Sequence, residues 1–224
     1  MALNESKGNM YSWITHTWNT VKGECPHGCI YCYMSRWGKQ KTVRFDESEL
    51  KTDLGTGKFI FVGSSCDLFA DGIPDSWIYK TLNHCNKFDN SYLFQSKNPG
   101  NMLQWIEAGM IPFKSIFCTT IETNRWIPDV MVNSPTPHQR SMDMNEIGHK
   151  GFETFVTIEP IIDFDLEQMV YLIETCLPKQ VNIGADSGNN HLPEPSKEKL
   201  MQLIKALKEF TIIDQKRNLA RLLK

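Results

Sequence analysis

The chain has 224 residues, a formal net charge of −2 and a hydrophobic fraction of 41%. This length suits a single α/β domain over residues 1–224, and the near-neutral charge does not indicate a protein that coats nucleic acid. No apolar run approaches the ~20 residues of a membrane span, and residues 1–7 lack a secretory apolar core, so we expect a cytoplasmic protein that does not insert into membranes.

Apolar, strand-like runs alternate with helix-like runs along the chain. Strands are predicted at residues 13–17, 58–63, 92–95, 115–120, 152–158 and 180–184, with a further short strand at 211–213. Helices are predicted at residues 46–54, 74–88, 99–108, 135–149, 165–176 and 196–210, and a basic helix at about 214–224. Six strands, each followed by a helix, predict a parallel sheet with right-handed crossovers.

Three of the seven cysteines fall within eight residues: Cys25, Cys29 and Cys32. They lie in a loop, residues 23–33, that we call the cluster loop, and their spacing lets three thiolates approach one metal centre. A [4Fe–4S] cluster takes four ligands, usually cysteines, so three thiolates leave one iron with an open position. The alternative is a structural zinc site with His27 as the fourth ligand, although His27 lies within the loop rather than at zinc-ligand spacing. A disulfide framework is not expected.

The Cys-x-x-x-Cys-x-x-Cys spacing, with Tyr31 directly before the third cysteine, resembles the radical S-adenosylmethionine (radical SAM) superfamily. The resemblance implies a partial (β/α)6 TIM-like barrel of parallel strands with outer helices. It also implies one [4Fe–4S] cluster and bound SAM, which an electron cleaves to methionine and a 5′-deoxyadenosyl radical that abstracts hydrogen from a substrate. An external one-electron reductant, such as flavodoxin or ferredoxin, would supply that electron. The chain is shorter than the ~250 residues of a full eight-unit barrel, which agrees with a partial one.

The resemblance extends to two narrower groups. Several segments look like those of a group of phage and bacterial radical-SAM-like proteins: 17–19, 62–64 with 67–69, 97–99, 158–160, and 183–184 with 187–188. The end of the cluster loop, residues 29–33, is also similar to the spore photoproduct lyase family, which repairs a thymine dimer in DNA. That similarity is local, and it keeps a nucleic-acid-directed modification or repair enzyme as an alternative.

Polar residues follow several predicted strands, and barrel active sites lie at the carboxyl ends of strands. Many radical SAM enzymes carry Gly-Gly-Glu after the second strand, where this chain has Gly63, Ser64 and Ser65. The resemblance implies cofactor contacts from the cluster loop and these strand ends. The candidates are Tyr31, Ser64, Ser65, Asp67, Lys97, Thr120, Glu122, Glu159 and Asn182. The alternatives are that Asp67 caps a helix, that Lys97 is a solvated surface lysine and that Glu159 is a buried structural carboxylate.

Two further cysteines, Cys66 and Cys118, lie near strand ends, where either could return a hydrogen atom to a product radical. The alternative is that both are small buried hydrophobic residues. Charges of both signs at the expected cavity mouth favour a small molecule, a nucleotide or an exposed base over intact duplex DNA as substrate. The rival hypothesis is a non-catalytic iron–sulfur or zinc module that recognises a partner such as nucleic acid through the basic end of the chain. We expect a monomer.

Overall fold

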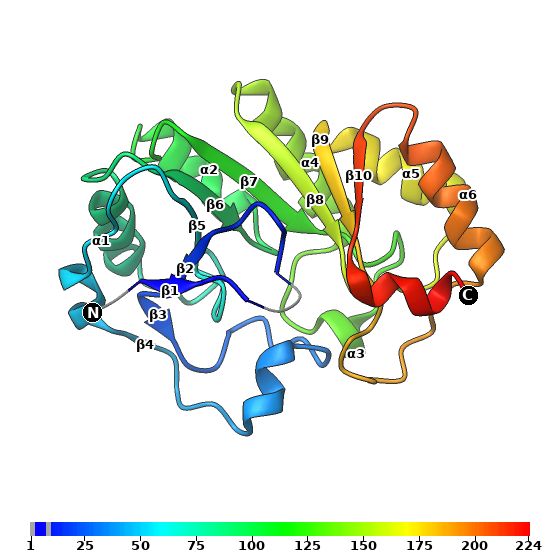
Figure 1. The fold of residues 1–224 in the computed structure, drawn as a ribbon, viewed down its shortest axis with the longest axis horizontal. Helices are drawn as coiled ribbons and strands as arrows, with labels where there is room; N and C mark the ends of the chain where they lie inside the picture. The colour runs from blue at the N-terminus through cyan, green and yellow to red at the C-terminus, as the bar shows by residue number, and fades with distance from the viewer. Residues whose placement is uncertain (1–2, 8–9) are drawn as a thin grey trace.

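A computed structural model describes residues 3–7 and 10–224, and a curved sheet of eight strands organises it (Figure 1). The strand order is β1-β2-β5-β6-β7-β8-β9-β10. All neighbours from β2 to β10 are parallel, and β1 pairs antiparallel with β2 at one edge. The strands are β1 (Asn4–Glu5), β2 (His16–Trp18), β5 (Phe59–Val62), β6 (Ser91–Gln95), β7 (Ser115–Thr120), β8 (Glu153–Ile158), β9 (Pro178–Ile183) and β10 (Ile212–Gln215). The predicted α/β class and the partial TIM-like barrel are confirmed.

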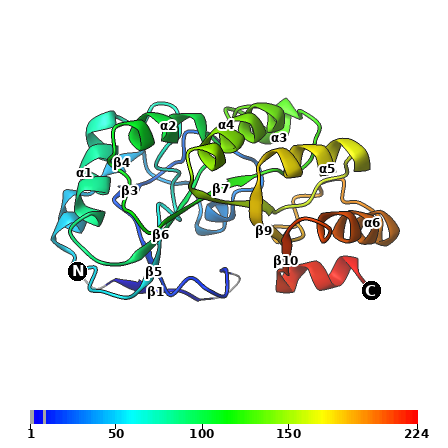
Figure 2. The ribbon, with the colours of Figure 1, turned by 90° about the horizontal axis from the view of Figure 1, so that it is seen from above.

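The helices connect successive strands and cover one face of the sheet. Figure 2 shows α1, α2, α4 and α5 in a row along that face, with α6 beside β10 at the end of the row. The α-helices are α1 (Asp75–Cys85), α2 (Gly100–Glu107), α3 (Pro128–Met131), α4 (Pro137–His149), α5 (Leu166–Thr175) and α6 (Lys197–Leu207). Three short 3-10 helices, η1 (Tyr33–Trp37), η2 (Glu47–Lys51) and η3 (Arg217–Leu222), lie outside the row.

Local sequence accounts for how the longer helices begin and how they pack. Thr136 accepts a hydrogen bond from the Gln139 backbone N–H at the start of α4, and Ser196 does the same for Lys199 at the start of α6. On α6 the buried residues form one stripe of leucine and isoleucine side chains: Leu200, Leu203, Ile204 and Leu207. The middle strands are buried on both faces, because the helices cover one face and the segment with Tyr11 and Ile14 packs on the other against Phe61, Leu93 and Phe155.

Several predicted elements differ from the structure. The helix predicted at 46–54 is the short 3-10 helix η2, and the first strand is His16–Trp18 rather than 13–17. The basic helix predicted at 214–224 is replaced by the end of β10 and by η3. The two-stranded sheet of β3 (Val21–Lys22) and β4 (Arg44–Phe45), with β1 and α3, was not predicted, because elements of two to four residues show no periodicity. Within residues 3–7 and 10–224, every helix is too short or too polar to cross a bilayer.

Candidate active site

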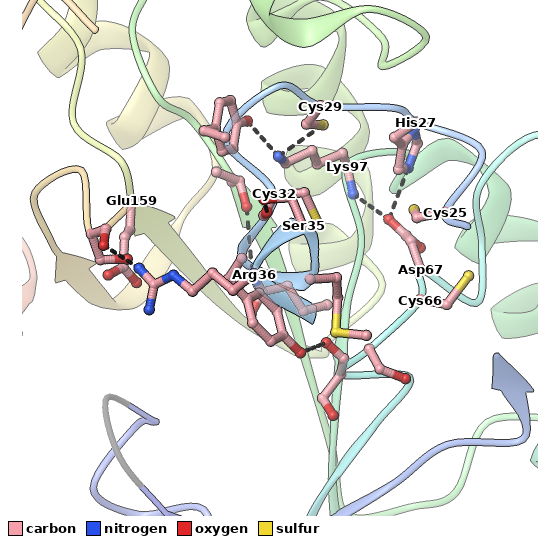
Figure 3. A pocket seen from close by; sticks show the side chains of 18 of the residues that line it. Cys25, His27, Cys29, Cys32, Ser35, Arg36, Cys66, Asp67, Lys97 and Glu159 are labelled. Carbon is pink, nitrogen blue, oxygen red and sulfur yellow. Dashed lines mark hydrogen bonds and ion pairs between the residues drawn. The ribbon is translucent and has the colours of Figure 1, made fainter. Parts of the chain in front are cut away.

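A cavity of about 740 Å³ lies where the cluster loop faces the carboxyl ends of the parallel strands. All three clustered cysteines line it, together with side chains that follow β5, β6, β7, β8 and β9. Figure 3 shows the cysteine, lysine and carboxylate side chains that meet there. The topology therefore brings the cluster loop and the strand ends to one place, which is where barrel enzymes carry their chemistry.

Backbone hydrogen bonds to the segment around α3 hold the cluster loop in place. The Ile30 N–H donates to the Val130 carbonyl at 3.4 Å, and the Asn133 N–H donates to the His27 carbonyl at 3.1 Å. The Asn133 side-chain amide also donates to the Pro26 carbonyl at 2.9 Å. The loop is thus held by residues that lie 100 or more positions later in the chain.

The three thiols have different surroundings. Cys25, Cys29 and Cys32 are free and half-buried. A hydrogen bond from the Cys66 thiol, together with the nearby His27, lowers the pKa of Cys25 below its usual range, which favours the thiolate form. The Lys97 ammonium donates to the Cys29 sulfur at 3.2 Å. Burial raises the pKa of Cys32 above its usual range.

This donor set fits an iron–sulfur cluster in its chemistry. Thiolates are the cluster's usual ligands, and here three unpaired thiols on one short loop face one cavity, with a cation beside one of them. Across the described ranges, no three His, Cys, Asp or Glu side chains are arranged to hold a metal ion.

A buried charge network stands behind the cluster loop. Glu122 and Arg140 are fully buried and pair at 2.8 Å, and the Lys97 ammonium lies 3.3 Å from the same carboxylate. The Tyr31 hydroxyl donates to Glu122 and accepts from Lys97. Burial alone would raise the pKa of Glu122, but the guanidinium and the ammonium lower it to about 2. Tyr31 and Lys97 are therefore held in fixed positions at the cavity wall by a permanently charged carboxylate.

Asp67 forms a second buried network that joins the cluster loop to the sheet. Its carboxylate accepts from the His27 ring at 2.8 Å, from the Ser96 hydroxyl at 2.9 Å and from the Lys97 backbone N–H at 2.9 Å. Burial opposes ionisation, yet His27 and these donors hold the pKa of Asp67 below its usual value. Asp67 lines the cavity, but its carboxylate already accepts several hydrogen bonds. The Nε2 atom of His27 is the ring nitrogen that contacts Asp67.

Glu159 lies on the opposite wall and pairs with the end of the chain. Lys216 contacts its carboxylate at 2.5 Å, and the Asn218 amide donates to it at 2.7 Å. A methyl group at Gly184 would lie within 2.9 Å of the Glu159 side chain, so only glycine allows this approach. Two basic residues at the chain end are therefore tied to the body of the protein: Lys216 lines the cavity, and Arg221 pairs with Glu194.

The predicted site residues divide into two groups. The cavity is lined by Tyr31, Ser64, Ser65, Cys66, Asp67, Lys97, Thr120 and Glu159, besides the three clustered cysteines. The structure does not bring Glu122, Asn182 or Cys118 to the cavity surface. Glu122 lies behind Tyr31, the Asn182 amide is buried in the sheet and donates to the Val156 carbonyl at 3.4 Å, and Cys118 is 1% exposed.

Sequence reasoning missed several residues that shape the site. Arg140 neutralises Glu122 from the middle of α4, and Asn19 accepts from the Ser64 hydroxyl and the Ser65 N–H. Arg36 donates to the Ser187 carbonyl across the cavity mouth. A lone arginine on an otherwise apolar helix face was a signal for a buried partner, because unpaired arginines are almost never fully buried. Arg36 and Asn19 carried no such signal.

Comparison with solved structures shows the fold. A spore photoproduct lyase variant with bound AdoMet and dinucleoside spore photoproduct matches with a TM-score of 0.67 at 9% identity, covering 95% of this chain and 80% of that one. A spore photoproduct lyase complexed with dinucleoside spore photoproduct matches with a TM-score of 0.66 at 10% identity, covering 94% and 78%. Streptococcus suis SuiB bound to precursor peptide SuiA matches with a TM-score of 0.60 at 10% identity, covering 89% and 48%.

These neighbours are radical SAM enzymes, so the predicted radical-SAM-like relationship is confirmed at the level of the fold. No curated protein matches the chain. A family model matches residues 9–205, which is most of the chain, and its description is "Protein of unknown function (DUF5131)". The chain therefore belongs to the DUF5131 family.

Proposed function

We propose that this chain is a radical SAM enzyme that holds one [4Fe–4S] cluster on Cys25, Cys29 and Cys32. The observation that carries the proposal is that these three free thiols, on one externally fixed loop, line a single cavity at the carboxyl ends of parallel strands. The fold shared with a lyase solved with AdoMet supports it. When bound, the cluster supplies the electron that cleaves SAM to methionine and a 5′-deoxyadenosyl radical, which takes hydrogen from the substrate.

The cavity wall offers the polar groups that SAM needs. In this proposal the Lys97 ammonium, which Glu122 and Tyr31 hold at the cavity wall, binds the methionine carboxylate. Ser64, Ser65, Thr120 and Glu159 line the same space and offer hydroxyl and carboxylate groups to the amino group and the ribose of SAM. Asp67, Glu122 and Asn182 act in this proposal by positioning other groups, because their side chains are bonded inside the wall or the sheet.

Cys66 is the better placed of the two proposed hydrogen-atom donors. It lines the cavity beside Cys25, whereas Cys118 lies outside the lining. The hydrogen bond to Cys25, reinforced by burial, raises the pKa of Cys66 far above its usual range, so its sulfur keeps the hydrogen that a donor must deliver. The remaining cysteines, Cys85 and Cys176, are buried on α1 and next to α5 and offer no second cluster site.

The substrate in this proposal is a small molecule, a nucleotide or an exposed base. An external one-electron reductant such as flavodoxin or ferredoxin supplies the electron, and the protein works as a cytoplasmic monomer. A nucleic-acid-directed reaction has specific support, because two structural neighbours were solved with dinucleoside spore photoproduct. SuiB was solved with a peptide, so the shared fold alone does not choose between these substrates.

Anaerobic reconstitution with iron and sulfide tests the proposal. The wild-type protein should bind about four irons, absorb near ~400 nm and release 5′-deoxyadenosine from SAM when reduced with dithionite. Alanine at Cys25, Cys29 or Cys32 should abolish both iron binding and SAM cleavage, whereas Cys176→Ala, which removes a buried thiol far from the cavity lining, should keep both. Full iron content and turnover in any one of the three variants would contradict the assignment.

A further inference from the structure

The segment 33–44, which directly follows Cys32, forms one rim of the cavity, and we call it the rim segment. It carries two exposed aromatic rings: Tyr33 is 42% and Trp37 is 68% exposed, and the rings meet edge to face with centroids 5.7 Å apart. It also carries four exposed cations. They are Arg36, Lys39, Lys41 and Arg44.

The charge of the rim segment is one-sided. Its twelve residues include no aspartate or glutamate, and within the described part of the chain none of its four cations forms an ion pair with a carboxylate. Inside the cavity, by contrast, the charges of Lys97 and Lys216 are balanced by Glu122 and Glu159, so the rim carries the surplus positive charge of this surface. A positively charged surface attracts anions. A nucleic-acid backbone is a highly charged one, because it carries a phosphate at each nucleotide.

The rim cations extend beyond the cavity itself. Arg36 and Lys39 line the cavity, and Figure 3 shows the Arg36 side chain reaching across its mouth. Lys41 and Arg44 instead line a second hollow of about 430 Å³, which shares Trp37 and Lys39 with the cavity. Lys41 and Arg44 lie outside the cavity lining, so a strand that runs past Trp37 through both hollows is the kind of ligand that could use all four cations.

The aromatic rings favour an unpaired strand. The Tyr33 hydroxyl donates to the Ser64 carbonyl at 2.7 Å, which fixes that ring, and Trp37 packs against it with most of its surface open. Fixed, exposed rings beside a cationic track are the elements that proteins use to bind single strands, where each base offers a face for stacking. Bases in a duplex have no free face, and an acidic peptide gains nothing from stacking.

We propose that the rim segment binds single-stranded nucleic acid and presents one nucleotide to the cavity. The inference names the substrate class of the proposed radical SAM function and rests on it for the chemistry. Binding of the strand itself requires only the rim segment, so it can be tested separately. The net charge of −2 does not oppose the proposal, because the four cations are local.

Fluorescence anisotropy with the full chain and fluorescein-labelled dT12 measures this binding. Four phosphate contacts predict a slope of about −2.8 for log K against log salt, since a single strand gives about −0.7 per contact. Lys39→Ala/Lys41→Ala should bring the slope to about −1.4. Trp37→Ala should weaken binding about 5- to 150-fold, the range measured for one stacked base, and Trp37→Phe should retain most of it.

Matched controls lie elsewhere on the surface. Trp126→Ala removes a tryptophan that is 41% exposed and lies outside the cavity lining, and Lys205→Ala/Lys208→Ala removes two cations at the end of α6. Both should leave dT12 binding unchanged. Equal or tighter binding of a 12-base-pair duplex, unchanged binding by Trp37→Ala, or equal competition by an acidic peptide would each overturn the proposal.

Measuring dT12 binding and SAM cleavage on the same reconstituted protein distinguishes a failure of this inference from a failure of the proposed function. Absence of dT12 binding in protein that still releases 5′-deoxyadenosine from SAM would overturn the rim proposal and leave the radical SAM function standing. Intact dT12 binding in reconstituted protein that binds no iron and cleaves no SAM would support the rim surface and contradict the radical SAM function.

Discussion

Glu122→Gln tests the buried charge network behind the cavity. Glutamine preserves the shape of the side chain but removes the one negative charge that the buried Arg140 and Lys97 share. Breaking a buried pair in this way costs about 3–5 kcal/mol, because an uncompensated charge stays buried. The pKa of Glu122 gives a second value for this loss of stability. Folding lowers that pKa from 4.5 to about 2, and at ~1.36 kcal/mol per pH unit the difference corresponds to about 3 kcal/mol.

Urea unfolding at pH 7 of the cluster-free protein measures this loss. We expect Glu122→Gln to lower the free energy of unfolding by about 3 kcal/mol and Arg140→Met to lower it less, because Glu122 keeps Lys97 and the Tyr31 hydroxyl. Glu107→Gln is the control, since Glu107 forms an exposed pair with Lys150 that should contribute under ~1 kcal/mol. A loss below ~1 kcal/mol for Glu122→Gln, or a larger loss for Arg140→Met, would refute the reasoning.

The pH dependence of stability gives an independent check on the same carboxyl. Its pKa is lower in the folded protein than in the unfolded chain, so its contribution is complete above about pH 4.5 and is lost as the pH falls towards 2. Wild type should therefore lose more stability than Glu122→Gln over this acid range. Parallel curves for the two proteins would show that Glu122 is not held ionised by its partners.

Three further substitutions probe the cavity wall. Gly184→Ala should lower the melting temperature by several degrees in a thermal scan, because the added methyl displaces the Glu159 carboxylate; an unchanged transition would argue against the close approach. Asp67→Asn should lower the pKa of His27, which its carboxylate now raises, and a histidine NMR titration that shows no change would contradict the buried pair. Lys97→Ala should weaken SAM binding at least tenfold in calorimetry while iron content stays near wild type, and unchanged affinity would place the methionine carboxylate elsewhere.

The parts of the site that the sequence predicts are those that depend on local spacing or on topology. Cys25, Cys29 and Cys32 are close in sequence, so a single loop must carry them together. Parallel strands end at one edge of a sheet, so polar residues after β5 and β6 had to meet there. These two arguments need no knowledge of the side-chain packing, and they place Ser64 and Lys97 at the cavity.

The remaining features of the site depend on how deeply each side chain is buried. A position near the end of a strand does not reveal that depth. Side chains alternate between the two faces of a strand, so Asn182 is buried in the sheet although it lies near the end of β9. Glu122 is covered by a tyrosine from the cluster loop, a contact between residues 91 positions apart. Lys216 was expected on a basic terminal helix, and only the pairing of β10 with β9 carries it to Glu159.

The hydrogen bonds between the cluster loop and the α3 segment bear on how the proposed cluster would be inserted. In small zinc domains the metal organises the polypeptide, and removing it unfolds the chain. Here Val130 and Asn133 hold the loop backbone through hydrogen bonds that need no metal. On the proposed function, the chain would therefore fold before it takes up iron, and iron lost to oxygen could be replaced without refolding. Loss of the Asn133 contacts would then make the fold depend on iron.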